Sequence, residues 1–231
     1  MIRATIVGAG GLGGPLALSL GAAGIELTIV DPDLVEESNL HRQIQFSAAD
    51  LGKPKATLLA DAVVARGGRA KGYQTRWRTE DADDISADSD LIIDGSDDPD
   101  TKFAVADWAV VNGRPYVIAA ALRYGGNVFV GGPGAGCYRC LFEEPVAAAT
   151  CAAAGVLGPV VGAIGGLAAA LAIGLANGDR RHIGSIWVFD DLRRVQEPRI
   201  VRFEPRPGCT TCAKAPFRPD RVLIASGGND A

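Results

Sequence analysis

Four of the five cysteines in this 231-residue chain form two pairs with the same spacing. The pairs are Cys137-Tyr-Arg-Cys140 and Cys209-Thr-Thr-Cys212, and glycine and proline lie close to each. Two CxxC pairs can present four thiolates in a tetrahedron, which satisfies Zn²⁺ without leaving a coordination position for water. A redox role is the alternative, but we expect both pairs in loops rather than at a helix start, where a thiolate would be activated. The spacing therefore predicts a structural zinc site.

A second set of residues surrounds a glycine turn near the N-terminus. Gly8, Gly10 and Gly13 follow an apolar run and precede a helical segment in the GxGxxG spacing, which lets backbone N–H groups and the helix N-terminus approach a phosphate. Asp31 ends the next apolar run, where a carboxylate can bind a ribose hydroxyl. A tight turn made only for packing would leave Asp31 unexplained. The pattern predicts a nucleotide site, without separating NAD from ATP.

The residues after Asp31 make the prediction more specific. They read Asp31-Pro-Asp33-Leu-Val-Glu-Glu-Ser38-Asn39-Leu40-His41-Arg42-Gln43 and continue to Gly52-Lys53-Pro54-Lys55. With the glycine turn and both CxxC pairs, this run resembles the ThiF/MoeB/HesA family of adenylyltransferases, bacterial relatives of ubiquitin-activating enzymes, over nearly the whole chain.

The resemblance implies that the nucleotide is ATP and gives each residue a part in binding it. Asp31 is expected on the ribose, Gly11 and Asn39 on the nucleotide, and Arg42, Gln43 and Lys55 on the triphosphate, with Asp33 in the same site. Two cations fixed beside a triphosphate would stabilise the charge that develops on departing pyrophosphate. Ordinary solvated charges are the alternative for Arg42 and Lys55.

A cluster of acidic residues follows a third apolar run, in the segment Asp94-Gly95-Ser96-Asp97-Asp98. The family resemblance implies that Asp97 binds Mg²⁺ and that Asp98 lies beside it in the nucleotide site. Three carboxylates this close would repel one another, so we expect a divalent cation or solvent among them. Capping of a helix that begins at Pro99 is the alternative, and both can hold. Asp98 and Lys102 depart from the residues usual in the family, Asn and Arg.

Cys151 stands apart, in an Ala-rich run before residue 159. The resemblance implies that this run crosses over the active site and that its cysteine serves sulfur transfer in some members. The chain has no Lys or Arg from Cys140 to Cys151, nor from there to Asn177, to lower the pKa of the thiol. We therefore expect Cys151→Ser to spare adenylation and to affect only sulfur transfer. A small apolar filler is the alternative.

These residues are expected on a Rossmann-like, doubly wound, mostly parallel sheet with an antiparallel C-terminal extension. The two CxxC pairs, called zinc knuckles below, are expected to form a knuckle pair on this fold. Apolar runs at 2–7, 25–30, 70–75, 91–93 and 116–121 alternate with helical segments at 15–23, 54–66 and 100–111, which predicts a parallel sheet. Strands at 127–130, 185–189 and 199–203 are expected to run antiparallel. We predict one domain over 1–231, with a nucleotide-binding half (1–123), a zinc-bearing half (124–225) and a disordered tail (226–231).

The charge and composition exclude several classes of protein. A net charge of −4 provides no basic field for nucleic acid or an anionic membrane, and the N-terminus lacks the pattern of a signal peptide, so we expect a cytoplasmic protein. The uncharged run from Pro159 to Ala176 has the length of a short membrane span. Its Gly/Ala composition instead favours a closely packed buried helix, and with the family resemblance it predicts a homodimer.

The function expected from the resemblance is adenylation of the C-terminal Gly-Gly carboxylate of a small ubiquitin-like sulfur-carrier protein, with ATP, Mg²⁺ and structural Zn²⁺. An acyl-adenylate and pyrophosphate would form, for later conversion to a thiocarboxylate. Relatives carry an N-terminal helix with an arginine that reaches the partner's ATP, whereas the sequence given begins at the first strand. A non-catalytic nucleotide-binding scaffold subunit is one alternative, and an NAD-dependent oxidoreductase is another.

Overall fold

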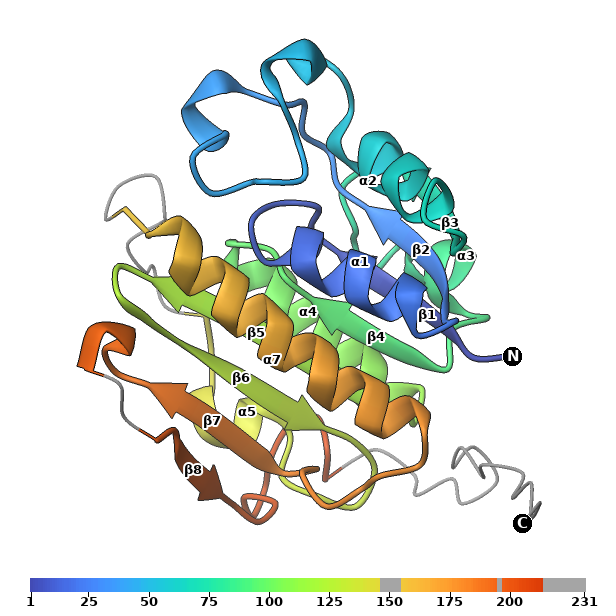
Figure 1. Cartoon of the computed structure of the whole chain (residues 1–231). Coiled ribbons are helices and arrows are strands. Elements are labelled where there is room, and N and C mark those ends of the chain that lie inside the picture. The colour runs from blue at the N-terminus through green and yellow to red at the C-terminus, as the bar shows by residue number, and fades with distance from the viewer. Residues whose placement is uncertain (146–154, 195–196, 214–231) are drawn as a thin grey trace, which may run out of the picture.

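A single eight-stranded sheet forms the centre of the computed structural model, which describes residues 1–145, 155–194 and 197–213 (Figure 1). Its strand order is β3-β2-β1-β4-β5-β6-β7-β8. The parallel strands are β1 (Arg3–Val7), β2 (Glu26–Val30), β3 (Arg69–Tyr73), β4 (Leu91–Asp94) and β5 (Tyr116–Leu122). The antiparallel ones are β6 (Gly125–Gly131), β7 (Ser185–Phe189) and β8 (Arg199–Arg202). The predicted fold class is confirmed.

Helices cover both faces of the sheet, which explains why strands such as β4 are buried along their length. On one face lie α1 (Gly13–Ala22), α2 (Lys55–Val64) and α7 (Gly158–Ala176), and α7 crosses the sheet beside α1 (Figure 1). On the other lie α3 (Ala82–Ser86), α4 (Pro99–Val111) and α5 (Tyr138–Phe142). Three short 3-10 helices are η1 (Glu37–Asn39), η2 (Ala48–Asp50) and η3 (Leu192–Arg194).

The sequence did not predict α3 or α5. Each has only five residues, which is too short for a helical hydrophobic period to show in the sequence. The segment of residues 31–52, between β2 and α2, contains η1 and η2. The predicted tail at 226–231 lies outside the described residues.

Helix α7 is buried along one face only. Small residues let it approach α1 closely, since a Cβ at Gly165 would lie 2.8 Å from the carbonyl oxygen of Leu12. By length and composition alone α7 could span a membrane, with a mean hydropathy of 2.0, but half of that apolar window is buried in the fold. Its outer face carries the exposed side chains of Pro159, Ala163 and Ala170.

A test of the packing concerns Gly131, at the end of β6 over the ring of Tyr116. A Cβ at Gly131 would lie 2.0 Å from that ring, which is fully buried and held by a 3.0 Å hydrogen bond from the backbone N–H of Tyr138 to its hydroxyl oxygen. Because the ring has no room to move, we expect Gly131→Ala to lower the free energy of unfolding by about 1–3 kcal/mol in urea denaturation. The control is Gly174→Ala in α7, where the nearest atom to a Cβ would be 3.8 Å away. It should be neutral or up to about 1 kcal/mol more stable. Equal effects of the two substitutions would contradict this account.

Candidate functional site

A cavity of about 1020 Å³ lies at the carboxyl ends of the parallel strands, where the strand order reverses between β1 and β4. Open α/β sheets bind ligands at this place, because the loops after neighbouring strands diverge there. The predicted nucleotide residues come from separate loops and meet in the cavity, with the exception of Gly13. Those that line it are Gly8, Gly10, Gly11, Asp31, Asp33, Asn39, Arg42, Gln43, Lys55, Asp97 and Asp98.

The glycine turn needs glycine for two different reasons. Gly8 has a φ of +94°, and a Cβ there would lie 2.8 Å from the backbone nitrogen of Ser96. Gly13 does not face the cavity, but a Cβ there would lie 1.9 Å from the carbonyl oxygen of Gly8. Gly13 therefore lets α1 begin directly against the end of β1, which brings the helix N-terminus to the cavity.

Asp31 ties this turn to the end of β2. Its carboxylate accepts hydrogen bonds from the backbone N–H of Ala9 at 2.6 Å and of Asp33 at 2.8 Å. Burial raises the pKa of Asp31, while these two N–H donors and Lys55 oppose the rise. The carboxylate that is predicted to bind ribose thus also fixes the shape of the loop around it.

The two predicted cationic side chains, Lys55 and Arg42, are each held by a contact with another residue of the cavity wall. Lys55 begins α2 and is buried, with its Nζ 3.0 Å from an oxygen of Asp33. The guanidinium of Arg42 donates to the side-chain oxygen of Asn39 and, at 3.3 Å, to the carbonyl oxygen of Ser38. The side-chain oxygen of Gln43 is buried with no hydrogen-bond partner in the described part of the chain. The cavity wall therefore carries these two positive charges, and it also carries a side-chain amide oxygen without a hydrogen-bond partner among the described residues.

The acidic cluster differs from the sequence prediction. Asp94 is fully buried, and its charge is balanced by Lys102, whose Nζ lies 2.7 Å from a carboxylate oxygen. Asp98 caps α4 by accepting from the backbone N–H of Thr101 at 3.2 Å. Two of the three carboxylates therefore have partners in the fold, which limits the repulsion, and the expectation of a divalent cation or solvent now concerns mainly Asp97. Only Asp97 is exposed to the cavity without an ion pair to a described residue.

Two further residues, Gln45 behind the glycine turn and Arg76 in the cavity lining, have no signal in the sequence. The amide nitrogen of Gln45 donates to the carbonyl oxygens of Ala9 and Gly10, at 2.9 Å each, and so braces the glycine turn from behind. Arg76 lines the cavity after β3, with its guanidinium 3.9 Å from Asp98. Both residues contact partners that are far away in the sequence, so the spacing of residues along the chain could not reveal them.

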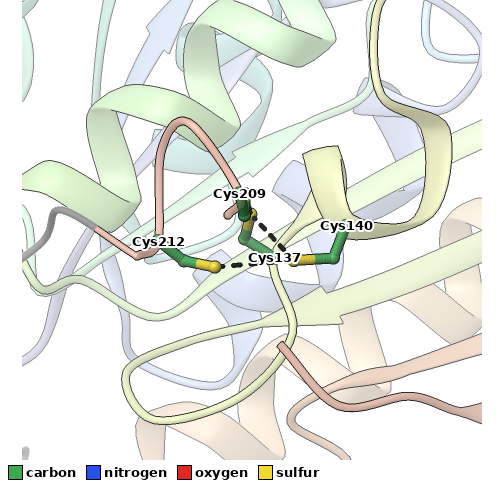
Figure 2. A group of neighbouring side chains, drawn as sticks. All are labelled: Cys137, Cys140, Cys209 and Cys212. Carbon is green, nitrogen blue, oxygen red and sulfur yellow. Dashed lines mark hydrogen bonds between the residues drawn. The ribbon is translucent and has the colours of Figure 1, made fainter. Parts of the chain in front are cut away.

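The four paired cysteines come together on the α4 face of the sheet, with the first pair on the segment of α5 and the second on the C-terminal loop (Figure 2). Their Sγ atoms all lie within 4.8 Å of one another, and three of the separations are 3.5, 3.6 and 3.7 Å. Tetrahedral ligation at a Zn–S distance of about 2.3 Å requires S–S separations of about 3.8 Å. The donor set therefore fits Zn²⁺.

The surroundings of Cys137 and Cys209 shift the pKa values of these two thiols in opposite directions. Burial raises the pKa of Cys137 well above its usual range. Burial also acts to raise the pKa of Cys209, but hydrogen bonds from the backbone N–H groups of Thr211 and Cys212 outweigh it and lower that pKa to about 6. Cys209 is accordingly more readily available as a thiolate than Cys137.

One expectation about the knuckles is wrong: Cys137 is the N-cap residue of α5 and does not lie in a plain loop. The two knuckles are also joined to α4 through Asp107. That carboxylate accepts from Arg139 of the first knuckle at 2.8 Å and from the hydroxyl of Thr211 in the second at 3.0 Å. Cys151, predicted for sulfur transfer, lies outside the described residues.

The structure is a Rossmann-like α/β fold with a cavity at the point where the strand order reverses and a four-cysteine cluster whose geometry fits a metal ion. The profile of the ThiF family matches residues 1–211, and the chain belongs to that family. It is 37% identical over 224 residues to the adenylyltransferase and sulfurtransferase MOCS3 of Dictyostelium discoideum, covering 91% of this chain and 52% of that protein. It is 36% identical over 230 residues to the sulfur carrier protein adenylyltransferase of Thermus thermophilus, covering 94% and 84%.

The chain thus spans about half the length of several curated relatives that it matches, including MOCS3. Among solved structures, E. coli MccB with ATP has a TM-score of 0.78 over 91% of this chain and 66% of that one. At 20% sequence identity this likeness shows the fold alone.

If the four cysteines hold zinc, the purified protein should contain about one metal ion per chain. Cys209→Ser removes one ligand, so we expect loss of the metal and a lower melting temperature, because binding of structural zinc contributes on the order of 10 kcal/mol to folding. Metal content by mass spectrometry and thermal denaturation check this. Thr210→Ser, in the same loop but without a ligand atom, is the control and should keep both properties. A stable wild-type protein without metal would refute the zinc site.

Proposed function

We propose that this chain is an ATP-dependent adenylyltransferase that activates the C-terminal Gly-Gly carboxylate of a small ubiquitin-like sulfur-carrier protein. The observation that supports the proposal is the convergence of the glycine turn, Asp31, two cations and Asp97 in one cavity. Relatives that share more than a third of their aligned residues are named as adenylyltransferases, one of them for sulfur carrier protein.

In the proposed reaction the carboxylate of the tail attacks the α-phosphorus of ATP. A carboxyl oxygen forms the new bond to phosphorus, the bond to the bridging oxygen of the β-phosphate breaks, and pyrophosphate leaves. No proton has to be transferred to or from an enzyme group, so positioning and electrostatic stabilisation supply the catalysis. The glycine turn would hold the phosphates by its N–H groups, while Arg42 and Lys55 would stabilise charge on the leaving pyrophosphate.

The exposed carboxylate of Asp97 is the residue that would hold Mg²⁺, since hard carboxylate oxygens suit this ion and no ion pair to a described residue competes for it. When bound, Mg²⁺ supplies positive charge to the phosphates. Lys55 would exchange its partner, Asp33, for phosphate oxygens, which explains why a buried lysine is paired with a carboxylate that is itself 61% exposed and can remain hydrated.

The two alternatives differ in what they require. An NAD-dependent oxidoreductase needs the glycine turn and Asp31, but it leaves Lys55, Arg42 and Asp97 without a task. A scaffold subunit would bind nucleotide with the same residues and would release no pyrophosphate. Carrier-dependent ATP–pyrophosphate exchange by the purified chain therefore separates the proposed enzyme from both.

Asp97→Asn tests the proposed role of the exposed carboxylate. The substitution keeps size and shape but removes the charge, so we expect carrier-dependent pyrophosphate exchange to fall by at least about 100-fold. Circular dichroism and zinc content should not change, because the side chain of Asp97 forms no hydrogen bond or ion pair with a described residue. The control is Asp100→Asn, which removes an exposed charge from the first turn of α4 outside the cavity and should leave exchange near wild type. Wild-type exchange by Asp97→Asn at ordinary magnesium concentration would overturn the assignment.

We also propose a homodimer that packs the outer face of α7 against its copy. This face is apolar, and at Gly162 and Gly166 a Cβ would meet no atom within 4 Å in the described chain. Two such faces can approach closely because mainly small side chains project from them, and burial of apolar surface then favours association.

Gly166→Trp tests the dimer. In a monomer the new side chain would project into open space, whereas in the proposed dimer it would lie between the two α7 helices and keep them apart. We therefore expect the variant to be a folded monomer by sedimentation at tens of micromolar, a concentration at which we expect wild type to be a dimer. Val64→Trp, an exposed apolar position on α2, is the control and should remain dimeric. Wild type that sediments as a monomer would contradict the proposal.

A further inference from the structure

The cavity extends beyond the predicted nucleotide residues onto the antiparallel half of the sheet. The strand register places Ala120 of β5, Asn127 of β6 and Val188 of β7 side by side in one row, and all three line the cavity. Because alternate residues of a strand face opposite sides, these neighbours share a face. That face also carries Ile118 and Phe129, which are packed in the core on the side of α4 and α5.

Aromatic side chains from α4 and α5 line the same cavity. They are Phe103, Tyr138 and Phe142, and the ring centres are 5.0 Å apart between Phe103 and Tyr138 and 4.8 Å apart between Tyr138 and Phe142. Asn127 is therefore the one polar side chain in the row of Ala120, Asn127 and Val188. The aromatic residues that line the same cavity are also mainly apolar.

Asn127 is unusual for its position. Asparagine is depleted in strands, and a partly buried amide is costly unless it is hydrogen-bonded. The side chain is half-buried, its cross-strand neighbours Ala120 and Val188 offer no polar side chain, and no described residue forms a hydrogen bond with its amide. Neither packing in the sheet nor a structural hydrogen bond accounts for this residue.

We propose that Asn127 is a positioning residue that holds the backbone of an extended peptide segment, the C-terminal tail of the carrier; this inference rests on the proposed function. A primary amide offers one acceptor oxygen and two N–H donors, so it can bind both the N–H and the C=O of a peptide group, whatever the side chain. Apolar surface on either side excludes water from these hydrogen bonds and strengthens them.

The row also gives the bound tail a direction. Its Ala120 end adjoins the carboxyl end of β4, because Lys102 donates hydrogen bonds both to the carbonyl oxygen of Ala119, at 2.8 Å, and to Asp94. The loop with Asp97 begins there, so the terminal carboxylate lies at this end, beside the nucleotide. The body of the carrier lies beyond Val188, where Asp190 also lines the cavity.

Asn127→Leu tests the assignment, since it keeps a similar volume and removes every hydrogen bond. With a sulfur-carrier protein ending in Gly-Gly, we expect the KM for the carrier to rise about 3- to 10-fold, the range for one or two neutral hydrogen bonds. The affinity for ATP measured by calorimetry without carrier should stay at the wild-type value. Asn177→Ala, an exposed asparagine after α7, is the control and should change neither quantity.

A second measurement identifies the hydrogen bond itself. Carriers are prepared semisynthetically with one of the last three peptide bonds replaced by an ester, which removes a single backbone N–H. If the oxygen of Asn127 accepts from that N–H, one of the esters should weaken binding to wild type and cause no further loss with Asn127→Leu. This cycle uses folded, zinc-replete proteins, so general destabilisation cannot produce the expected result.

The outcomes separate the two proposals. Absence of carrier-dependent exchange in wild type would refute the proposed function and this inference with it. Wild-type exchange with an unchanged carrier KM in Asn127→Leu would overturn only the role of Asn127. Equal weakening of ATP binding in that variant would also overturn it, because Asn127 would then serve the nucleotide rather than the tail.

Discussion

The buried ammonium group of Lys102 fixes the point at which the sheet, α4 and the cavity meet. It donates to the carboxylate of Asp94 at 2.7 Å and to the carbonyl oxygens of Ser96 and Ala119 at 2.6 and 2.8 Å. Burial raises the pKa of Asp94, and Lys102 opposes that rise. A buried charge left without its partner costs about 3–5 kcal/mol, so neither residue of the pair can be replaced alone without loss. The loop after β4 is held from inside the protein, which leaves Asp97 exposed to the cavity.

Helix α4 extends this support to the other half of the molecule. Lys102 and Asp107 both belong to α4, and Asp107 accepts hydrogen bonds from both cysteine knuckles. Tyr138 and Phe142 are carried by α5, whose N-cap residue is Cys137, so the cysteine cluster also positions the aromatic side of the cavity. The four cysteines thus have a consequence for the shape of the site as well as for stability.

The sequence predicted the features that depend on local pattern or short spacing. Buried parallel strands such as β4 are recognisable as apolar runs, and the glycine turn with Asp31 is a short-range signature. Features that depend on how separate elements pack against one another were not predictable. Lys102 neutralises Asp94 from the next helix, and Gln45 braces Ala9 from 36 residues away, so neither partner is evident from spacing. Asn127 was predicted within a strand, but only the register of β5, β6 and β7 shows that its neighbours leave its amide unpaired.

The separation of the paired cysteines along the chain also sets an order of events during synthesis. Cys137 and Cys209 are 72 residues apart, and the second pair follows β8, the last strand in the described part of the chain. While the ribosome is still adding β7 and β8, the parallel strands and α5 have already emerged, and domains fold as their segments become available. Until residue 212 is added, Cys137 and Cys140 lack the other two thiols of the cluster. Premature termination before the second pair would therefore leave a nascent chain that has most of its sheet but is open to oxidation and to capture by chaperones.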